Sequence, residues 1–80
     1  MKSTEEKVLR WVYEQAGATG KVVEVNALTD RRLMDGVDVS DAVDALLAGG
    51  FVTRVALGRV VSVTPKGSAV ASKLPPSGWP

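Results

Sequence analysis

The sequence contains neither cysteine nor histidine, and only 5% of its 80 residues are aromatic. Without these two residue types the chain has no disulfide, no thiolate nucleophile, no usual structural zinc site and no histidine general base. We therefore expect a protein that is not an enzyme and that needs no cofactor or metal.

Long hydrophobic runs are missing as well. The apolar stretches are only a few residues long, whereas a membrane-spanning helix needs about 20 apolar residues. Residues 1–6 are mostly polar and carry no apolar segment of a signal peptide. We expect a cytoplasmic protein with no membrane partner, folded as one domain around a modest core.

Charge is nearly balanced overall but unevenly distributed. The net charge is only +1, yet all nine acidic side chains lie in residues 1–50, together with six of the ten basic ones. Residues 51–80 hold the other four basic side chains and no acidic one. Such asymmetry suggests a nucleic-acid partner, although chance segregation of this many charges explains it equally well.

The first third of the chain predicts a helix and then a strand. Ser3 and Glu6 have the spacing of a capping box, and the apolar residues behind them repeat at intervals of three and four, which predicts a helix over 3–16 that ends at the glycines of 17–20. Residues 21–25 are too few and too β-branched for a helix and predict a short strand. Val8, Leu9, Val12 and Ala16 share the face expected to be buried, with Trp11 and Tyr13 near its edges. Trp11 is expected in the core or at its rim, with an anchor for a partner as the alternative.

A second helix is expected over 26–35. Asn26 is a favoured N-cap residue, with Thr29 as a competing start. Leu28, Leu33 and Met34 give this helix its buried side. Asp35 and Gly36 close it, and Gly36-Val37 then form a tight turn into a third helix.

The third helix and the hairpin after it organise the rest of the chain. Apolar residues spaced by three and four predict a helix over 38–49, capped by Asp38 and ended by two glycines. Two β-rich runs, 51–56 and 59–64, flank a turn at Leu57-Gly58 and predict a hairpin. The residues expected in the core are Val39, Val43, Leu46, Leu47 and Phe51.

The C-terminal part predicts a fourth helix and a tail. Thr64 is a good N-cap and Pro65 fits the first helical position, which predicts a helix over 65–73. The prolines and glycine of residues 75–80 exclude regular structure, so a flexible tail is expected. Trp79 is an anchor for a partner or an incidental residue of this tail.

A helix that leads directly into a hairpin resembles the second half of a winged-helix domain. The likeness is carried by Leu46 four residues before Gly50, by Phe51-Val52 with Arg54, and by Val63-Thr64-Pro65-Lys66-Gly67 after the hairpin. The same order is seen in small bacterial regulators of the multiple-antibiotic-resistance-repressor type. The resemblance implies an α+β winged helix-turn-helix over residues 1–74, with a three-helix core, a small three-stranded antiparallel sheet whose hairpin is the wing, and a short fourth helix.

The resemblance also implies duplex DNA as the partner. Winged helices usually place the third helix in the major groove and the wing near the minor groove or backbone. Carried onto this sequence, Val37, Asp38, Ser40, Asp41 and Asp44 would face the groove, Arg59 would sit at the wing tip, and helix 2 would approach phosphate. The DNA-binding residues expected from this resemblance are Thr29, Arg31, Arg32, Ser40, Asp44, Arg54, Arg59 and Lys66.

The sequence departs from the family pattern in the third helix. Residues 37–50 contain no lysine, arginine, asparagine or glutamine, the residues that most often read base edges. The alternative is a protein-interaction module that uses an acidic third helix and a basic wing without binding DNA. A homodimer through the first and fourth helices would double the phosphate contacts and favour the DNA interpretation.

Overall fold

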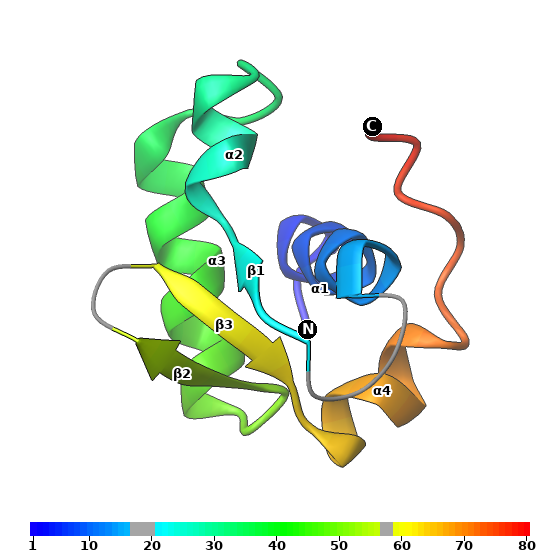
Figure 1. Cartoon of the computed structure of the whole chain (residues 1–80). Helices are drawn as coiled ribbons and strands as arrows, with labels where there is room; N and C mark the ends of the chain where they lie inside the picture. The colour runs from blue at the N-terminus through cyan, green and yellow to red at the C-terminus, as the bar shows by residue number, and fades with distance from the viewer. Residues whose placement is uncertain (17–20, 57–58) are drawn as a thin grey trace.

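The protein is an α+β domain in which helices pack against one face of a small antiparallel sheet. The computed structural model describes residues 1–16, 21–56 and 59–80. In this part of the chain there are four helices and three strands, arranged as Figure 1 shows. In chain order they are α1 (Ser3–Ala16), β1 (Val23–Glu24), α2 (Asn26–Asp30), α3 (Gly36–Ala48), β2 (Val52–Ala56), β3 (Val60–Val63) and α4 (Pro65–Ala71).

The sheet has the strand order β1-β3-β2, and both pairs are antiparallel. The hairpin strands β2 and β3 pair from Val52 opposite Val63, with an irregularity between Arg54 and Ala56. The expected third strand is present but only two residues long, with Val23 opposite Val61. The predicted hairpin and third strand are therefore confirmed, whereas the predicted turn at Leu57-Gly58 and the helix end at 17–20 lie outside the described residues.

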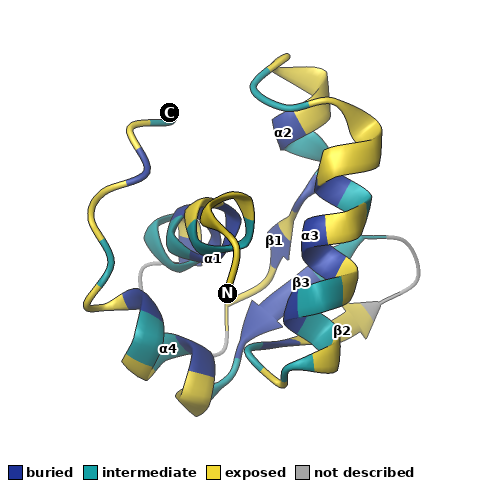
Figure 2. Ribbon diagram, turned by 180° about the vertical axis from the view of Figure 1, so that it is seen from behind, coloured by how far each residue is buried: buried dark blue, intermediate teal, exposed yellow. Residues whose placement is uncertain are grey.

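The core lies between α1, α3 and the inner face of the sheet. Figure 2 shows that the buried positions of α1 and α3 face each other and the sheet. Trp11 belongs to this core with 1% of its surface exposed, as predicted. Leu47 and Phe51 are only half-buried at its rim, which corrects their prediction as core residues. The fully buried core side chains include Val8, Leu9, Val12, Val25, Leu28, Val39, Leu46 and Val61.

Helix α1 begins at Ser3 as predicted, but the predicted capping box between Ser3 and Glu6 does not form at its N-terminus. The reciprocal contact lies one residue earlier, because the Lys2 N–H donates to Glu5 Oε1 at 3.4 Å. Ser3 is itself helical, so its side chain does not stand at the N-cap position. The glutamate at N3 thus accepts a hydrogen bond from the backbone N–H of the N-cap residue, whose own side chain makes no capping bond.

Helix α2 is shorter than predicted and its expected cap is wrong. Val25 takes the N-cap position without a side-chain hydrogen bond, and Asn26 is the first helical residue. The helix ends at Asp30 because Arg32 adopts a positive φ of 58°, a left-handed conformation that interrupts the helix. Leu28 is buried, while Leu33 and Met34 pack at the edge of the core from the following turns.

Helix α3 starts two residues earlier than predicted. Asp35 is its N-cap, and the Asp35 carboxylate accepts from the Asp38 N–H at 2.8 Å. The predicted cap at Asp38 and the predicted turn at Gly36-Val37 are therefore wrong. Both aspartates have suitable chemistry, and the one that precedes the glycine makes the cap because the chain is already extended at Asp35.

Helix α4 follows the sheet directly and begins as predicted. Thr64 is the N-cap and its hydroxyl accepts from the Gly67 N–H at 3.0 Å, with Pro65 in the first turn. The backbone of Gly67 lies so close to Phe51 that a β-carbon at this position would overlap the Phe51 carbonyl oxygen. Glycine is therefore required where α4 crosses the start of the hairpin.

Residues 75–80 run back beside α1 after α4 (Figure 1). Ser77 is buried with 7% of its surface exposed, and Trp79 packs against the core as a half-buried side chain. The predicted tail therefore lies against α1, one of the two helices that the sequence analysis offers to a dimer partner. Among the described residues, no helix has the length and apolar character required to cross a membrane.

Candidate nucleic-acid interface

An open hollow lies between α3 and the β2–β3 hairpin. Its volume is about 310 Å³, and its lining combines two arginines, one aspartate and one serine with a single apolar side chain. The lining residues are Ser40, Val43, Asp44, Arg54 and Arg59. Four of the eight residues that the resemblance assigns to DNA are thus brought together: Ser40, Asp44, Arg54 and Arg59.

Helix α3 and the β2–β3 hairpin position these side chains. Ser40 and Asp44 are one helical turn apart and share one side of α3, with buried Val43 beneath them. Arg54 lies in β2 opposite Val61, and Arg59 directly precedes β3, where its carbonyl accepts from the Val25 N–H at 3.0 Å. The hairpin therefore places both arginines beside Ser40 and Asp44 of α3.

The charges in this hollow remain open to solvent. Asp44 and Arg54 are exposed and Arg59 is half-buried. Within the described residues, the one ion pair joins Arg10 to Glu14 and lies elsewhere, so neither arginine is neutralised by Asp44. The hollow can accept an anionic group on its two guanidiniums, with the carboxylate limiting how much negative charge is tolerated.

Two of the other predicted DNA contacts are engaged elsewhere. Arg31 donates from Nη1 to the main-chain oxygen of Pro80 at 3.0 Å. Lys66 donates from Nζ to the Gly49 carbonyl at 2.7 Å and lies 4.7 Å from the centroid of the Phe51 ring. Lys66 thus caps the C-terminus of α3, a favourable place for a cation.

The remaining two predicted contacts, Thr29 and Arg32, are exposed on and after α2. Neither lines the hollow between α3 and the hairpin. The predicted set is therefore divided: four residues line the hollow, Thr29 and Arg32 are exposed on and after α2, and Arg31 and Lys66 are hydrogen-bonded at two other places.

The outer side of α3 is acidic. Asp38, Asp41 and Asp44 are all exposed, and Val37 in the first turn is 69% exposed. The described part of the chain contains no group of three or more acidic side chains placed to hold a metal ion. This side of the helix is a solvated, negatively charged surface with one apolar residue at its end.

A second polar constellation, which the sequence analysis missed, lies where residues 75–80 contact α1. Glu14 accepts two hydrogen bonds from Ser77 and one from Arg10. Burial alone would raise the pKa of Glu14, but the Ser77 hydrogen bonds and the Arg10 charge outweigh it and hold the pKa below its ordinary value. The only sequence signal for this contact was the tryptophan in a tail that otherwise consists of proline, serine and glycine.

Comparisons of the chain with family models, with curated proteins and with solved structures find no match.

Proposed function

We propose that the chain is a winged-helix domain that binds duplex DNA as a small transcriptional regulator. The proposal is supported by the element order, in which a short strand between α1 and α2 pairs with the hairpin that follows α3. In the winged-helix plan this hairpin is the wing and α3 is the recognition helix. The fold hosts other uses too, so the function is argued from the side chains of the hollow.

The observation that carries the proposal is the joint position of Arg54 and Arg59 beside α3. Both arginines line the hollow with Ser40 and Asp44, and no other described residue neutralises them by an ion pair. A phosphate group of the DNA backbone can accept hydrogen bonds from two guanidinium groups. The Ser40 hydroxyl can donate a further hydrogen bond to the same phosphate. The wing then supplies the phosphate contacts that α3 lacks.

This arrangement predicts weak, salt-sensitive binding with little direct base reading. Phosphate contacts supply most of the DNA affinity of such proteins, and their contribution to that affinity falls as the salt concentration rises. Arg31 and Lys66 already donate hydrogen bonds to main-chain oxygens of the same chain. The remaining cations of the predicted set are exposed Arg32, exposed Arg54 and half-buried Arg59. A homodimer through α1 and α4 stays a prediction that would double these contacts.

The decisive experiment is a binding titration of the whole chain with a random duplex at several salt concentrations. We expect measurable binding at about 50 mM salt that weakens steeply toward about 200 mM. The Lys73→Ala variant is a matched control, because Lys73 is an exposed cation remote in sequence from the hairpin. Failure of the wild-type chain to bind at about 50 mM salt and high micromolar protein would reject the DNA proposal.

The second candidate is a protein-interaction module, and the acidic side of α3 favours it. Three exposed carboxylates and exposed Val37 form a surface suited to a basic partner, and like charges oppose approach to DNA. The Asp44→Ala variant separates the two functions. If Asp44 faces phosphate, its removal tightens non-specific DNA binding; if α3 binds a basic protein, its removal weakens that complex and DNA does not bind.

A further inference from the structure

One main-chain oxygen at the C-terminal end of the described chain receives three hydrogen bonds. The Pro80 oxygen accepts from Trp11 Nε1 at 3.0 Å, from Arg31 Nη1 at 3.0 Å and from Gln15 Nε2 at 3.4 Å. Trp11 is only 1% exposed, so its indole N–H is held in place by the core. These donors come from α1 and from the residue after α2, and they converge on one acceptor.

A second set of contacts holds the segment at Ser77, three residues before Pro80. The Ser77 hydroxyl donates to Glu14 Oε1 at 2.6 Å and the Ser77 N–H donates to Glu14 Oε2 at 3.1 Å. The Glu14 carboxylate is fixed in turn by Arg10 Nε at 3.0 Å, and Arg10 also donates to the Ala71 carbonyl at 3.0 Å. Glu14 therefore recognises both the backbone and the side chain of Ser77.

The aromatic ring between these two sets is held by a cation. Lys7 Nζ lies 4.8 Å from the centroid of the Trp79 ring, within the range of a cation–π interaction. Trp79 is half-buried and borders a hollow that Leu33 and Met34 also line. The Trp79 N–H donates to the Ser77 hydroxyl at 3.2 Å, which gives the segment a local turn that matches the surface of α1.

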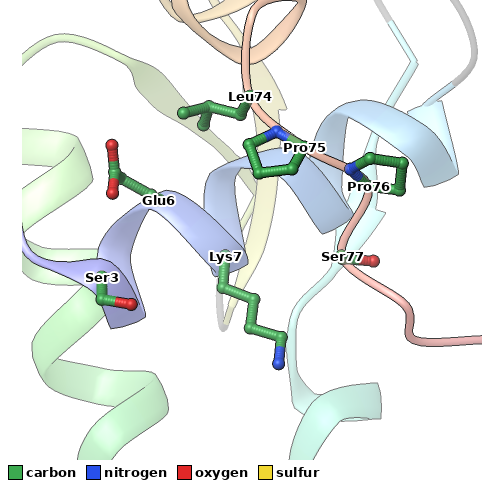
Figure 3. A pocket seen from close by; sticks show the side chains of 7 residues that line it. All are labelled: Ser3, Glu6, Lys7, Leu74, Pro75, Pro76 and Ser77. Atoms are coloured by element: carbon green, nitrogen blue, oxygen red, sulfur yellow. The ribbon is translucent and has the colours of Figure 1, made fainter.

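The connection from α4 to these contacts is short and passes through two adjacent prolines. Pro75 and Pro76 are exposed, and Figure 3 shows them crossing over α1 above a hollow of about 290 Å³ lined also by Ser3, Glu6 and Lys7. Paired prolines form a stiff spacer. The hydrogen bonds and the cation–π contact that join residues 77–80 to the rest of the described chain all end on α1 or on Arg31, and none ends on α4.

From this separation we propose that the surface of α1 is a peptide-recognition site for a Ser-Gly-Trp-Pro segment that turns at its glycine, occupied by the chain's own residues 77–80. The site reads three features at fixed spacing: a serine hydroxyl on Glu14, an indole on Lys7, and a main-chain oxygen on Trp11, Gln15 and Arg31. Its ligand is recognised by these contacts and not by its covalent link to α4. The same segment therefore binds from solution when the internal copy is weakened.

The internal segment has the advantage of its linkage. A short connection gives an effective concentration on the order of millimolar, so a free peptide competes poorly with the wild-type segment. The Trp79→Ala variant removes the indole contact and lowers this advantage. It also leaves Trp11 as the single tryptophan of the chain, whose indole N–H signal reports directly on the oxygen it binds.

The test is an NMR titration of the full-length ¹⁵N-labelled Trp79→Ala variant with the unlabelled peptide acetyl-Pro-Pro-Ser-Gly-Trp-Pro-amide. The amide end presents a carbonyl oxygen at the position of the Pro80 oxygen. We expect a saturable shift of the Trp11 indole signal toward its wild-type position, with a dissociation constant of roughly 0.1–1 mM. The same peptide with alanine in place of tryptophan should bind the variant at least about tenfold more weakly. The wild-type chain should bind the original peptide about two- to tenfold more weakly, because its internal segment competes.

Two results would overturn the proposal. The first is a folded Trp79→Ala variant whose Trp11 signal does not move at peptide concentrations of several times about 1 mM. The second is a Trp11 signal that is identical in the wild type and in the Trp79→Ala and Ser77→Ala variants, because the segment would then not be docked. If Trp79→Ala does not fold, the titration is made on Ser77→Ala, in which the two indole signals are assigned separately.

Discussion

The two sides of the domain use their polar side chains in opposite ways. On the side of α1 that residues 75–80 cover, Glu14, Trp11 and Arg31 all bond to groups of the same chain. On the side of the hairpin, no hydrogen bond or ion pair joins Arg54 or Asp44 to another described side chain. The first side is therefore occupied by a segment of the chain itself, whereas the charges of the second side are open to the partner proposed above.

Both sides rest on one core, and Leu46 is the side chain that tests this most strongly. It is 1% exposed, so Leu46→Ala should lower the free energy of unfolding by about 2–5 kcal/mol. Denaturant unfolding checks the value, with half-buried Leu47→Ala as the milder control. A loss below about 0.5 kcal/mol would place Leu46 at the surface and break the link between the two sides.

Removing arginines from each side in turn tests which side contributes to DNA binding. Arg54→Ala with Arg59→Ala should lower the slope of DNA affinity against salt by about two units, one for each lost phosphate contact. Arg31→Ala should leave the slope nearly unchanged, because Arg31 is bonded to Pro80. An equal loss from Arg31→Ala would show that the side of α1 also faces the DNA.

The next effect concerns the stability of the tail side alone. Trp79→Ala should cost about 1–2 kcal/mol, from lost apolar burial and a cation–π contact with Lys7. Thermal unfolding measures this loss, and DNA affinity should stay within about twofold because the hairpin is untouched. Heteronuclear NOE values at residues 77–79 complete the test: values like those of α3 mean a docked segment, and much lower values mean the flexible tail that the sequence predicts.

The smallest expected effect is a pH dependence of the tail side. The pKa of Glu14 lies below its ordinary value of 4.5 in the folded protein, so the ionised carboxylate stabilises the docked segment above about pH 4.5 and the contribution is lost as pH falls through the lowered pKa. The Trp11 indole signal should therefore change as the pH falls below the ordinary value and through the lowered pKa of Glu14. In Glu14→Gln this change should disappear, while a change that persists would assign it to other carboxylates.

The parts of the fold that local pattern controls were predictable. The spacing of apolar residues placed α1 and the inner side of α3, and β-branched runs placed the hairpin and its third strand. The start of α3 was misjudged because Asp35 and Asp38 are equally good caps by residue type, and only the backbone at Asp35 decides between them. The end of α2 depends on the positive φ of Arg32, which no neighbouring glycine or proline announces.

The candidate sites were predictable to different degrees for the same reason. Ser40, Asp44, Arg54 and Arg59 meet because helix period and hairpin register bring them together, and the resemblance assigned all four. The contacts of Arg31 and Trp11 with Pro80 join residues 49 and 69 positions apart. No periodic pattern encodes such a pair, so the sequence offered Arg31 to DNA and left Trp79 unassigned.

The close approach of Gly67 to the Phe51 carbonyl has a consequence for tracing the ancestry of this chain. Side chains of a core drift together over evolutionary time, because volume can be redistributed among neighbours. A backbone that touches another backbone has no such freedom, since any β-carbon at residue 67 would overlap the Phe51 oxygen. Remote descendants of the same ancestor should therefore keep a glycine three residues after the threonine that caps α4, even where every other residue of the pattern has been replaced.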